Sequence, residues 1–283
     1  MPVLDEILAN VRARQARVVF PELQDDRVRA AAERLEREGI CVPLGIGGET
    51  DLHVEALIKA RGMKENIARR LLRKPLYRAA AMVAVGEADA MAAGAKFTSR
   101  RVVEAASMVV GLSPQVKTLS SFFLMVFDDR PPLIFSDCAI NVAPDARALA
   151  EIAQASAKTG QALLGKARVA LLSFSTGRSG TGDSVDLMRK VAKITGFTGP
   201  VQADAALNPV VAARKGMGSG DANVLVFPSL DAGNIAYKLC TELAGAQAIG
   251  PVLQGMRRPV CDLSRGSSID EIVATTAVTL ALG

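Results

Sequence analysis

The chain of 283 residues is poor in the side chains on which many enzymes depend. It has one histidine, His53, no tryptophan and two tyrosines. His53 stands in a short amphipathic pattern and is expected to be exposed or half-buried. Unless it lies at the site, Ser-His-Asp and Cys-His mechanisms and most zinc sites are excluded. Aromatic residues make up 4% of the chain, which argues against a stacking surface for single-stranded nucleic acid.

Cysteines are few and scattered. The four thiols, at Cys41, Cys138, Cys240 and Cys261, form no C-x-x-C pair, and each stands among apolar residues. We therefore expect buried thiols rather than a disulfide framework, and no metal site.

Long apolar runs are also missing. No run reaches the roughly 18 residues that a membrane helix needs, and the first residues lack the pattern of a signal peptide. We expect a cytoplasmic protein without membrane contact. The formal charge of +5 suits small anionic ligands as well as it suits nucleic acid. The length allows one large or two ordinary domains.

Apolar runs and helical patterns alternate along most of the chain, which predicts an α/β fold with parallel sheet and helices on both faces. Two apolar runs, 116–127 and 133–137, flank a turn at 128–131 and predict a hairpin between the halves of the chain. A further strand is predicted at 200–205. Without an obvious linker, two domains would have to pack closely.

Residues 262–271 (DLSRGSSIDE) concentrate polar chemistry between an apolar strand and an apolar helix. Arg265 can fork onto a phosphate or carboxylate, and Ser264 can donate or accept a hydrogen bond. Asp270 or Glu271 could take a proton from a thiol or hydroxyl. Alternatively, Ser268 and Glu271 form a capping box, which only satisfies backbone N–H groups.

A second polar stretch, 171–183 (LLSFSTGRSGTGD), is a strand that runs into a Gly- and hydroxyl-rich loop. Such a loop can direct N–H groups and hydroxyls at a phosphate. It lacks the motifs of P-loops, dinucleotide sites and nucleophile elbows. The alternative is a simple connection with Asp183 or Ser184 as helix N-cap.

A third loop follows a strand at 227–238 and gives a weaker signal. Tyr237 and Lys238 lie about one helical turn past Asn234, so the three side chains could face one opening.

Six ordered groups of residues resemble the phosphate acetyl/butyryltransferase family. They are 19–22 (VFPE) with 25–27 (DDR), 87–91 (EADAM) with 94–95 (GA), 136–141 (SDCAIN) with 144–145 (PD), 173–180 (SFSTGRSG), 227–228 (FP) with 233–238 (GNIAYK), and 249–255 (IGPVLQG) with 262–266 (DLSRG). Together they span most of the chain.

The resemblance implies reversible acyl transfer between coenzyme A (CoA) and phosphate. It implies CoA as co-substrate, no permanent cofactor or metal, and a homodimer that contacts neither nucleic acid nor membrane. It also implies a two-domain fold with parallel or mixed sheets, like that of isocitrate and isopropylmalate dehydrogenases. We expect a first domain of 1–130 plus 265–283, an inserted second domain of 131–264, and an active site in the cleft between them.

Roles follow for matching residues. Arg265 would stabilise charge on the reacting phosphate or carbonyl oxygen, Ser264 would hydrogen-bond thiol or carbonyl, and Glu271, or Asp270 in its place, would act as base. The acyl-phosphate contacts would come from Thr176, Gly177, Arg178, Ser179, Gly180, Asn234, Tyr237 and Lys238. The CoA contacts would come from Ser120, Arg100 and Arg101.

The chain departs from the family pattern at three positions. Glu271 stands where aspartate is common, and Glu104 and Val126 stand where arginine is common; Arg100 and Arg101 lie one turn from Glu104. A non-catalytic relative that binds acetyl phosphate or acyl-CoA is therefore an alternative. A metal-dependent dehydrogenase of similar fold is disfavoured, because Asp137, Asp204 and Asp231 are scattered. Acyl length, from acetyl to butyryl, stays open.

Overall fold

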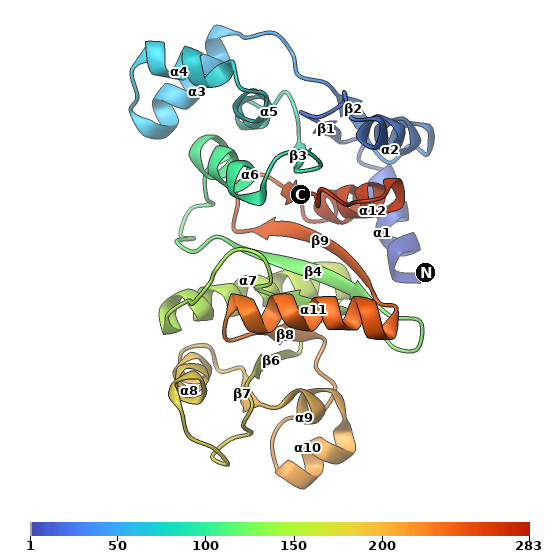
Figure 1. Cartoon of the computed structure of the whole chain (residues 1–283), viewed down its shortest axis with the longest axis vertical. Coiled ribbons are helices and arrows are strands. Elements are labelled where there is room, and N and C mark those ends of the chain that lie inside the picture. Colours follow the sequence, from blue (N-terminus) through green and yellow to red (C-terminus); the bar gives the residue numbers. More distant parts are fainter. Residues whose placement is uncertain (1) are drawn as a thin grey trace. The chain divides into compact units, whose positions relative to one another are not determined.

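The computed structural model describes residues 2–283 and confirms an α/β fold. Contacts divide the chain into two compact units (Figure 1). Unit 1 comprises residues 1–115 and 250–283, and unit 2 comprises residues 116–249. The sequence-based boundaries stood at 130/131 and 264/265. Among the described residues, no helix is long and apolar enough to cross a membrane.

Unit 1 is built on strands in the order β2-β1-β3-β10-β9, parallel except for the β10–β9 pair. Their bounds are β1 (Arg17–Val19), β2 (Val42–Leu44), β3 (Ala90–Ala93), β9 (Gln247–Gln254, which crosses the unit boundary) and β10 (Val260–Asp262). The helices are α1 (Pro2–Arg12), α2 (Asp26–Arg37), α3 (Asp51–Arg61), α4 (Glu65–Leu72), α5 (Pro75–Ala84), α6 (Ser99–Ala105), the π-helical turn η1 (Ala106–Val110) and α12 (Ile269–Leu280).

Two groups of helices cover this sheet. The first group is α12 with α1 and α2, and α12 contacts β3 and β10. The second is α5 with α3, α4, α6 and η1, and α5 contacts β1 and β3. The start of α2 shows how local sequence sets an element: Asp25 accepts a hydrogen bond from the Arg27 N–H and caps the helix. Its face of Val28, Ala31 and Leu35 is then buried.

Unit 2 is built on strands in the order β4-β5-β8-β6-β7. Their bounds are β4 (Ser120–Val126), β5 (Leu133–Ser136), β6 (Val169–Leu172), β7 (Thr198–Val201) and β8 (Val224–Val226). The helices are α7 (Ala146–Leu164), α8 (Asp183–Thr195), α9 (Ala203–Leu207), α10 (Pro209–Lys215) and α11 (Leu230–Ala244). The β4–β5 hairpin is confirmed as antiparallel, and the other pairs are parallel.

Three expectations need correction. The predicted strand at 200–205 is the end of β7 followed by α9, because the run of alanines from Ala203 favours a helix once Val201 has ended the strand. The sequence pattern at 99–110 predicts one continuous helix, but α6 is followed by a π-helical turn from Ala106. His53 is fully buried, because its two ring nitrogens pair with Glu87 and the Thr50 N–H. Three of the four cysteines are buried as expected, and Cys240 is half-buried.

Candidate active site

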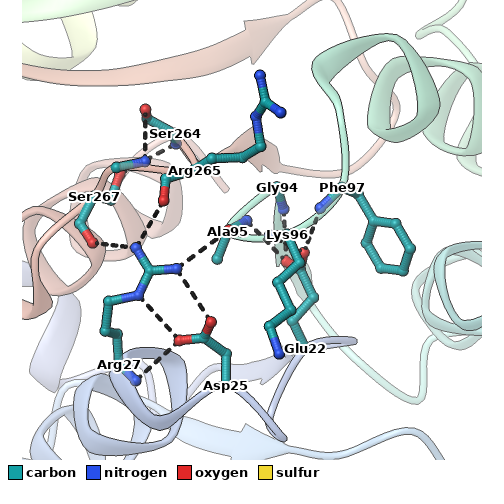
Figure 2. A network of polar contacts seen from close by, with 11 residues as sticks. Glu22, Asp25, Arg27, Gly94, Ala95, Lys96, Phe97, Ser264, Arg265 and Ser267 are labelled. Atoms are coloured by element: carbon teal, nitrogen blue, oxygen red, sulfur yellow. Dashed lines mark hydrogen bonds and ion pairs between the residues drawn. The ribbon is translucent and has the colours of Figure 1, made fainter.

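In unit 1, three loops meet at the carboxyl ends of the neighbouring parallel strands β1, β3 and β10 (Figure 2). This edge is where α/β sheets commonly bind ligands. Glu22, just after β1, fixes the loop after β3. Its carboxylate accepts four backbone N–H bonds, at 2.7, 3.0, 2.6 and 2.8 Å, from Gly94, Ala95, Lys96 and Phe97. A buried carboxylate with four donors is satisfied, so Glu22 organises this edge rather than reacting.

The loop after β10 is a tight turn with Arg265 and Gly266 at its tip. The Ser264 carbonyl accepts the Ser267 N–H at 3.0 Å, and the Ser267 hydroxyl accepts the Ser264 N–H at 3.1 Å. The Ser264 hydroxyl accepts the Gly266 N–H at 3.3 Å and keeps its own proton available for a ligand. The turn is therefore held by its own polar groups.

Arg265 has an exposed side chain that points away from Arg27 (Figure 2). Within residues 2–283, its guanidinium makes no hydrogen bond or ion pair. Five unused N–H donors at the tip of a fixed turn are suited to an anionic oxygen. Ser264 and Arg265, which are consecutive in the sequence, both lie on this turn.

The two carboxylates after this turn have structural partners. Glu271 Oε2 accepts the Ser268 N–H at 2.7 Å, and the Ser268 hydroxyl accepts the Glu271 N–H at 3.2 Å. The capping box is therefore confirmed. Glu271 Oε1 has no hydrogen bond within the described part of the chain. Asp270 is exposed and pairs with Arg34 of α2.

The start of α6 lies beside the same edge. The carboxyl of Asp262, at the end of β10, is buried, and burial is the main cause that raises its pKa to about 6. Asp262 Oδ1 is the one buried side-chain oxygen or nitrogen without a hydrogen bond in residues 2–283. Arg100 and Arg101 follow Ser99 and are exposed.

The two positions at which the family commonly has arginine, Glu104 and Val126, lie in different environments. Glu104 accepts a hydrogen bond from the Tyr77 hydroxyl at 2.9 Å. Burial, with a further contribution from Glu104, raises the pKa of Tyr77 to about 12. Val126 is buried at the end of β4. Glu104 thus has a local partner, whereas Val126 is a core side chain.

In unit 2, the loop after β6 carries the predicted phosphate-binding residues. Most of its polar groups bind one another: the Ser179 hydroxyl lies 3.0 Å from the Ser175 hydroxyl and accepts the Thr176 N–H at 3.1 Å. The Thr176 hydroxyl donates to the Gln202 side chain at 3.3 Å and accepts the Gln202 N–H at 3.1 Å. These hydroxyls set the loop conformation.

Arg189 of α8 holds the carbonyl groups of this loop. Its guanidinium donates to the Gly177 oxygen at 3.1 and 3.3 Å and to the Gly180 oxygen at 2.8 Å. Arg178, between the two glycines, is exposed, and its side chain has no polar partner in the described chain. Arg178 is therefore the group of this loop most able to meet an anion.

In the third predicted cluster, Asn234, Tyr237 and Lys238 each contact a group of the protein itself. The Asn234 amide donates to the Cys138 carbonyl at 3.1 Å, and Tyr237 stacks on Phe123 with 4.2 Å between ring centroids. The Lys238 ammonium lies over the Tyr237 ring, 5.1 Å from its centroid. Ser120, assigned to CoA, is fully buried at the start of β4.

The sequence-predicted residues thus fall into two sets. Unit 1 holds Ser264, Arg265, Asp270, Glu271, Arg100 and Arg101, and unit 2 holds the remainder. Sequence reasoning missed the roles of Glu22, Arg27 and Arg189. Glu22 and Arg27 stood in the resembling stretches, but nothing in their spacing indicated their partners. Arg189 looked like a solvated helix residue.

Comparisons with known proteins bear on the family and the fold. A model of the phosphate acetyl/butaryl transferase family matches residues 52–280. A phosphate acetyltransferase from Paracoccus denitrificans is 38% identical over 313 residues, covering 99% of this chain and 98% of that protein. The structure of a phosphotransacetylase from Streptococcus pyogenes superposes with a TM-score of 0.92 at 33% identity, covering 99% of this chain and 97% of that one.

The fold extends to more distant proteins. A putative 4-hydroxythreonine-4-phosphate dehydrogenase from Salmonella typhimurium has a TM-score of 0.54 at 12% identity, covering 95% of this chain and 99% of that one. This likeness confirms a dehydrogenase-like fold and nothing about activity. Family model, near-full-length identity and structural match together show that this chain belongs to the phosphate acetyl/butyryltransferase family.

Proposed function

We propose that this chain is a phosphate acetyltransferase that moves an acetyl group reversibly between CoA and inorganic phosphate. The observation that carries the proposal is the Arg265 guanidinium, which has no polar partner within residues 2–283 and stands at the tip of a hydrogen-bonded turn, next to the hydroxyl proton of Ser264. Near-full-length relatives that bear the name phosphate acetyltransferase support the choice of acetyl.

The reaction needs one bond made and one broken. The CoA sulfur attacks the carbonyl carbon of acetyl phosphate, a C–S bond forms, and the C–O bond to phosphate breaks, so that phosphate leaves with the bonding pair. Arg265 would stabilise the negative charge on the carbonyl oxygen or on the leaving phosphate. Ser264 would donate to the same oxygen. Direct attack requires no acyl-enzyme.

A base is needed because a free thiol has a pKa of about 8.5 and is mostly protonated at neutral pH. We assign this role to Glu271. The Ser268 N–H fixes Oε2 at 2.7 Å, which orients the carboxylate and leaves Oε1 to take the thiol proton. Asp270 is the less favoured base, because Arg34 already pairs with it.

In unit 2, Arg178 would bind the phosphoryl group, with the backbone of the loop from Thr176 to Gly180 as a supporting surface. The Thr176 and Ser179 hydroxyls would act by holding the loop, because both already have partners. Lys238 would contribute positive charge, and Asn234 and Tyr237 would shape the surface beside it. The cleft between domains, which the resemblance implies, stays a prediction.

CoA carries phosphate groups, and Arg100 and Arg101 are exposed cations in the first turn of α6. We propose that they bind these phosphates in place of the arginine that the family commonly has at position 104. Ser120 would act from within the core, since it has no exposed surface.

We further propose a homodimer formed through α11. Ile235, Leu239 and Leu243 recur every four residues on one face of this helix, and their side chains are 57%, 52% and 81% exposed. A second copy is the occupant that would bury this stripe by presenting the same stripe. Four unpaired cysteines are consistent with a reducing compartment such as the cytoplasm.

The activity is tested by following thioester formation from CoA and acetyl phosphate, with propionyl and butyryl phosphate in parallel. Turnover that reverses on adding phosphate would establish the transferase, and the ranking of the three substrates would name its acyl group. Binding of CoA or acetyl phosphate without turnover would instead favour the non-catalytic relative.

A further inference from the structure

We propose that Arg27 is a positioning residue that holds the turn bearing Arg265 in its active conformation. The role of Arg265 in catalysis rests on the proposed function, whereas the hold on the turn is a property of unit 1 alone. The role of Arg27 is therefore tested by two measurements, one of the conformation of the turn and one of the rate of turnover.

The guanidinium of Arg27 bridges three segments (Figure 2). Nη1 donates to the carbonyl oxygens of Arg265, at 2.8 Å, and Ser267, at 3.0 Å. Nη2 donates to the Ala95 carbonyl at 3.3 Å, in the loop that Glu22 organises. The same side chain thus ties the loop after β10 to the loop after β3 and to the start of α2.

Asp25 fixes the guanidinium itself. Its two oxygens accept Arg27 Nε and Nη2, each at 3.1 Å, and Oδ1 also accepts the Arg27 N–H at 3.0 Å as the cap of α2. The hydrogen bond from Arg27 is the main cause that lowers the pKa of Asp25. A bidentate pair anchored on a helix cap gives the guanidinium one orientation.

The number of occupied N–H donors on Arg27 indicates that this residue positions the turn and does not bind substrate. A guanidinium has five N–H donors, and Arg27 uses them on Asp25 twice, and once each on Ala95, Arg265 and Ser267. None remains for a substrate. Arg265, in contrast, has all of its side-chain donors free in the described chain. Arg27 binds the backbone of the residue whose side chain would bind the substrate.

The hold matters because Arg265 projects from the tip of a turn. The pairing of β10 with β3 places the base of the turn against the sheet edge. Arg27 adds the contacts at the tip, because it joins the Arg265 and Ser267 carbonyls to the loop after β3 and to the start of α2. A displacement of about 1 Å in a group that stabilises charge can cost about 100-fold in rate. Lysine offers one nitrogen with three donors and cannot reproduce the fork.

The first experiment compares Arg27→Lys with Arg17→Lys by hydrogen exchange of the backbone amides of residues 263–268. Arg17 is a matched control, because it forks onto Asp89 at 3.1 and 3.2 Å and reaches the Gly86 carbonyl at 2.9 Å, at the opposite end of β1. Arg27→Lys should speed exchange in this segment by about tenfold or more, and Arg17→Lys should leave it unchanged. Equal exchange in wild type and Arg27→Lys would overturn the proposal, whether or not the protein is active.

The second experiment measures turnover in the same variants. Arg27→Lys should lower kcat about 10- to 100-fold with a KM for CoA close to that of wild type, while Arg17→Lys keeps both. In an Arg265→Lys background, the same change at Arg27 should cost much less, because its effect passes through Arg265. If the effects of the two substitutions were fully additive, the link between Arg27 and Arg265 would be overturned. An inactive wild type would refute the proposed function, and the hydrogen-exchange result would still decide whether Arg27 stabilises the turn.

Discussion

Glu271 and Ser268 are joined by two reciprocal hydrogen bonds, from Ser268 N to Glu271 Oε2 at 2.7 Å and from Glu271 N to Ser268 Oγ at 3.2 Å. The residue assigned as base therefore also caps α12. The two roles can be separated, because capping needs an acceptor oxygen and base catalysis needs a carboxylate that takes a proton.

The substitution Glu271→Gln separates the capping role of this residue from its proposed role as base. The amide oxygen can still accept the Ser268 N–H, so the melting temperature should stay within a few degrees of wild type. Without a basic carboxylate, kcat should fall about 100-fold or more. A variant that keeps near-normal turnover would mean that another group, Asp270 first, removes the thiol proton; Asp270→Asn is the companion variant.

The second prediction concerns Gly94, where the backbone leaves no room for a side chain. Its φ is +119°, and a Cβ there would lie 2.4 Å from the Leu263 oxygen and 2.6 Å from Asp262 Oδ1. Gly94→Ala should therefore destabilise the fold by about 3–5 kcal/mol, from backbone strain plus overpacking. Gly86→Ala is the control, since φ is +82° there but a Cβ would meet nothing within 4 Å.

Urea unfolding of the two variants checks this difference. Gly86→Ala should lose only about 1–2 kcal/mol from the left-handed backbone conformation. Equal losses at the two glycines would show that the close approach of β3 and β10 at Leu263 does not constrain the site.

The raised pKa of Asp262 predicts that the stability of the fold depends on pH. Its folded pKa of about 6 exceeds the value of about 3.9 for an unfolded chain, so the folded state binds the proton more tightly. Below about pH 4 the carboxyl is protonated in both states and does not lower the free energy of unfolding. As the pH rises the carboxyl lowers this free energy, and the effect is complete above about pH 6. The cost at neutral pH is of the order of 2–3 kcal/mol.

Asp262→Asn removes this titration with almost no change in the size of the side chain. Its stability advantage over wild type should be small at pH 4 and should increase toward pH 7, as measured by urea unfolding at each pH. A stability difference that does not vary with pH would contradict the buried, poorly solvated state of this carboxyl.

The proposed dimer is tested on α11. Leu239→Glu places a charge in the centre of the exposed stripe and should convert a dimer to a monomer, measured by light scattering after size exclusion. Leu52→Glu on α3, where the side chain is 61% exposed, is the matched control and should leave the state unchanged. A wild type that is monomeric at micromolar concentration would refute the interface outright.

Most of the fold was predictable because its signals are local. Capping residues, Pro75 at the start of α5 and the period of apolar residues are signals of helices that the sequence itself contains. The Ser264–Arg265 turn was predictable for the same reason, since its chemistry is contained in ten residues. Short Ala-rich α9 was missed because an apolar run after a strand does not show where the strand stops.

The supporting residues could not be predicted, because their partners are distant in sequence. Arg27 and the Arg265 carbonyl are 238 residues apart, and His53 and Glu87 are 34 apart. Arg27 and His53 each stand in a local pattern that is typical of a solvent-facing helix residue. Only the packing of β1, β3 and β10 reveals that Arg27 and Glu22 organise the site, or that His53 is buried.

The most direct test of the account is the rate of thioester formation from CoA and acetyl phosphate by Arg265→Ala. The Arg265 side chain is exposed and has no polar partner in the described residues, so the variant should fold and melt like wild type. Arg37→Ala, another exposed arginine of unit 1, is the control and should retain wild-type turnover. We predict that Arg265→Ala loses turnover by about 1,000-fold or more, as expected for loss of the main charge-stabilising group; a near-normal rate would contradict the assignment of this turn as the catalytic centre.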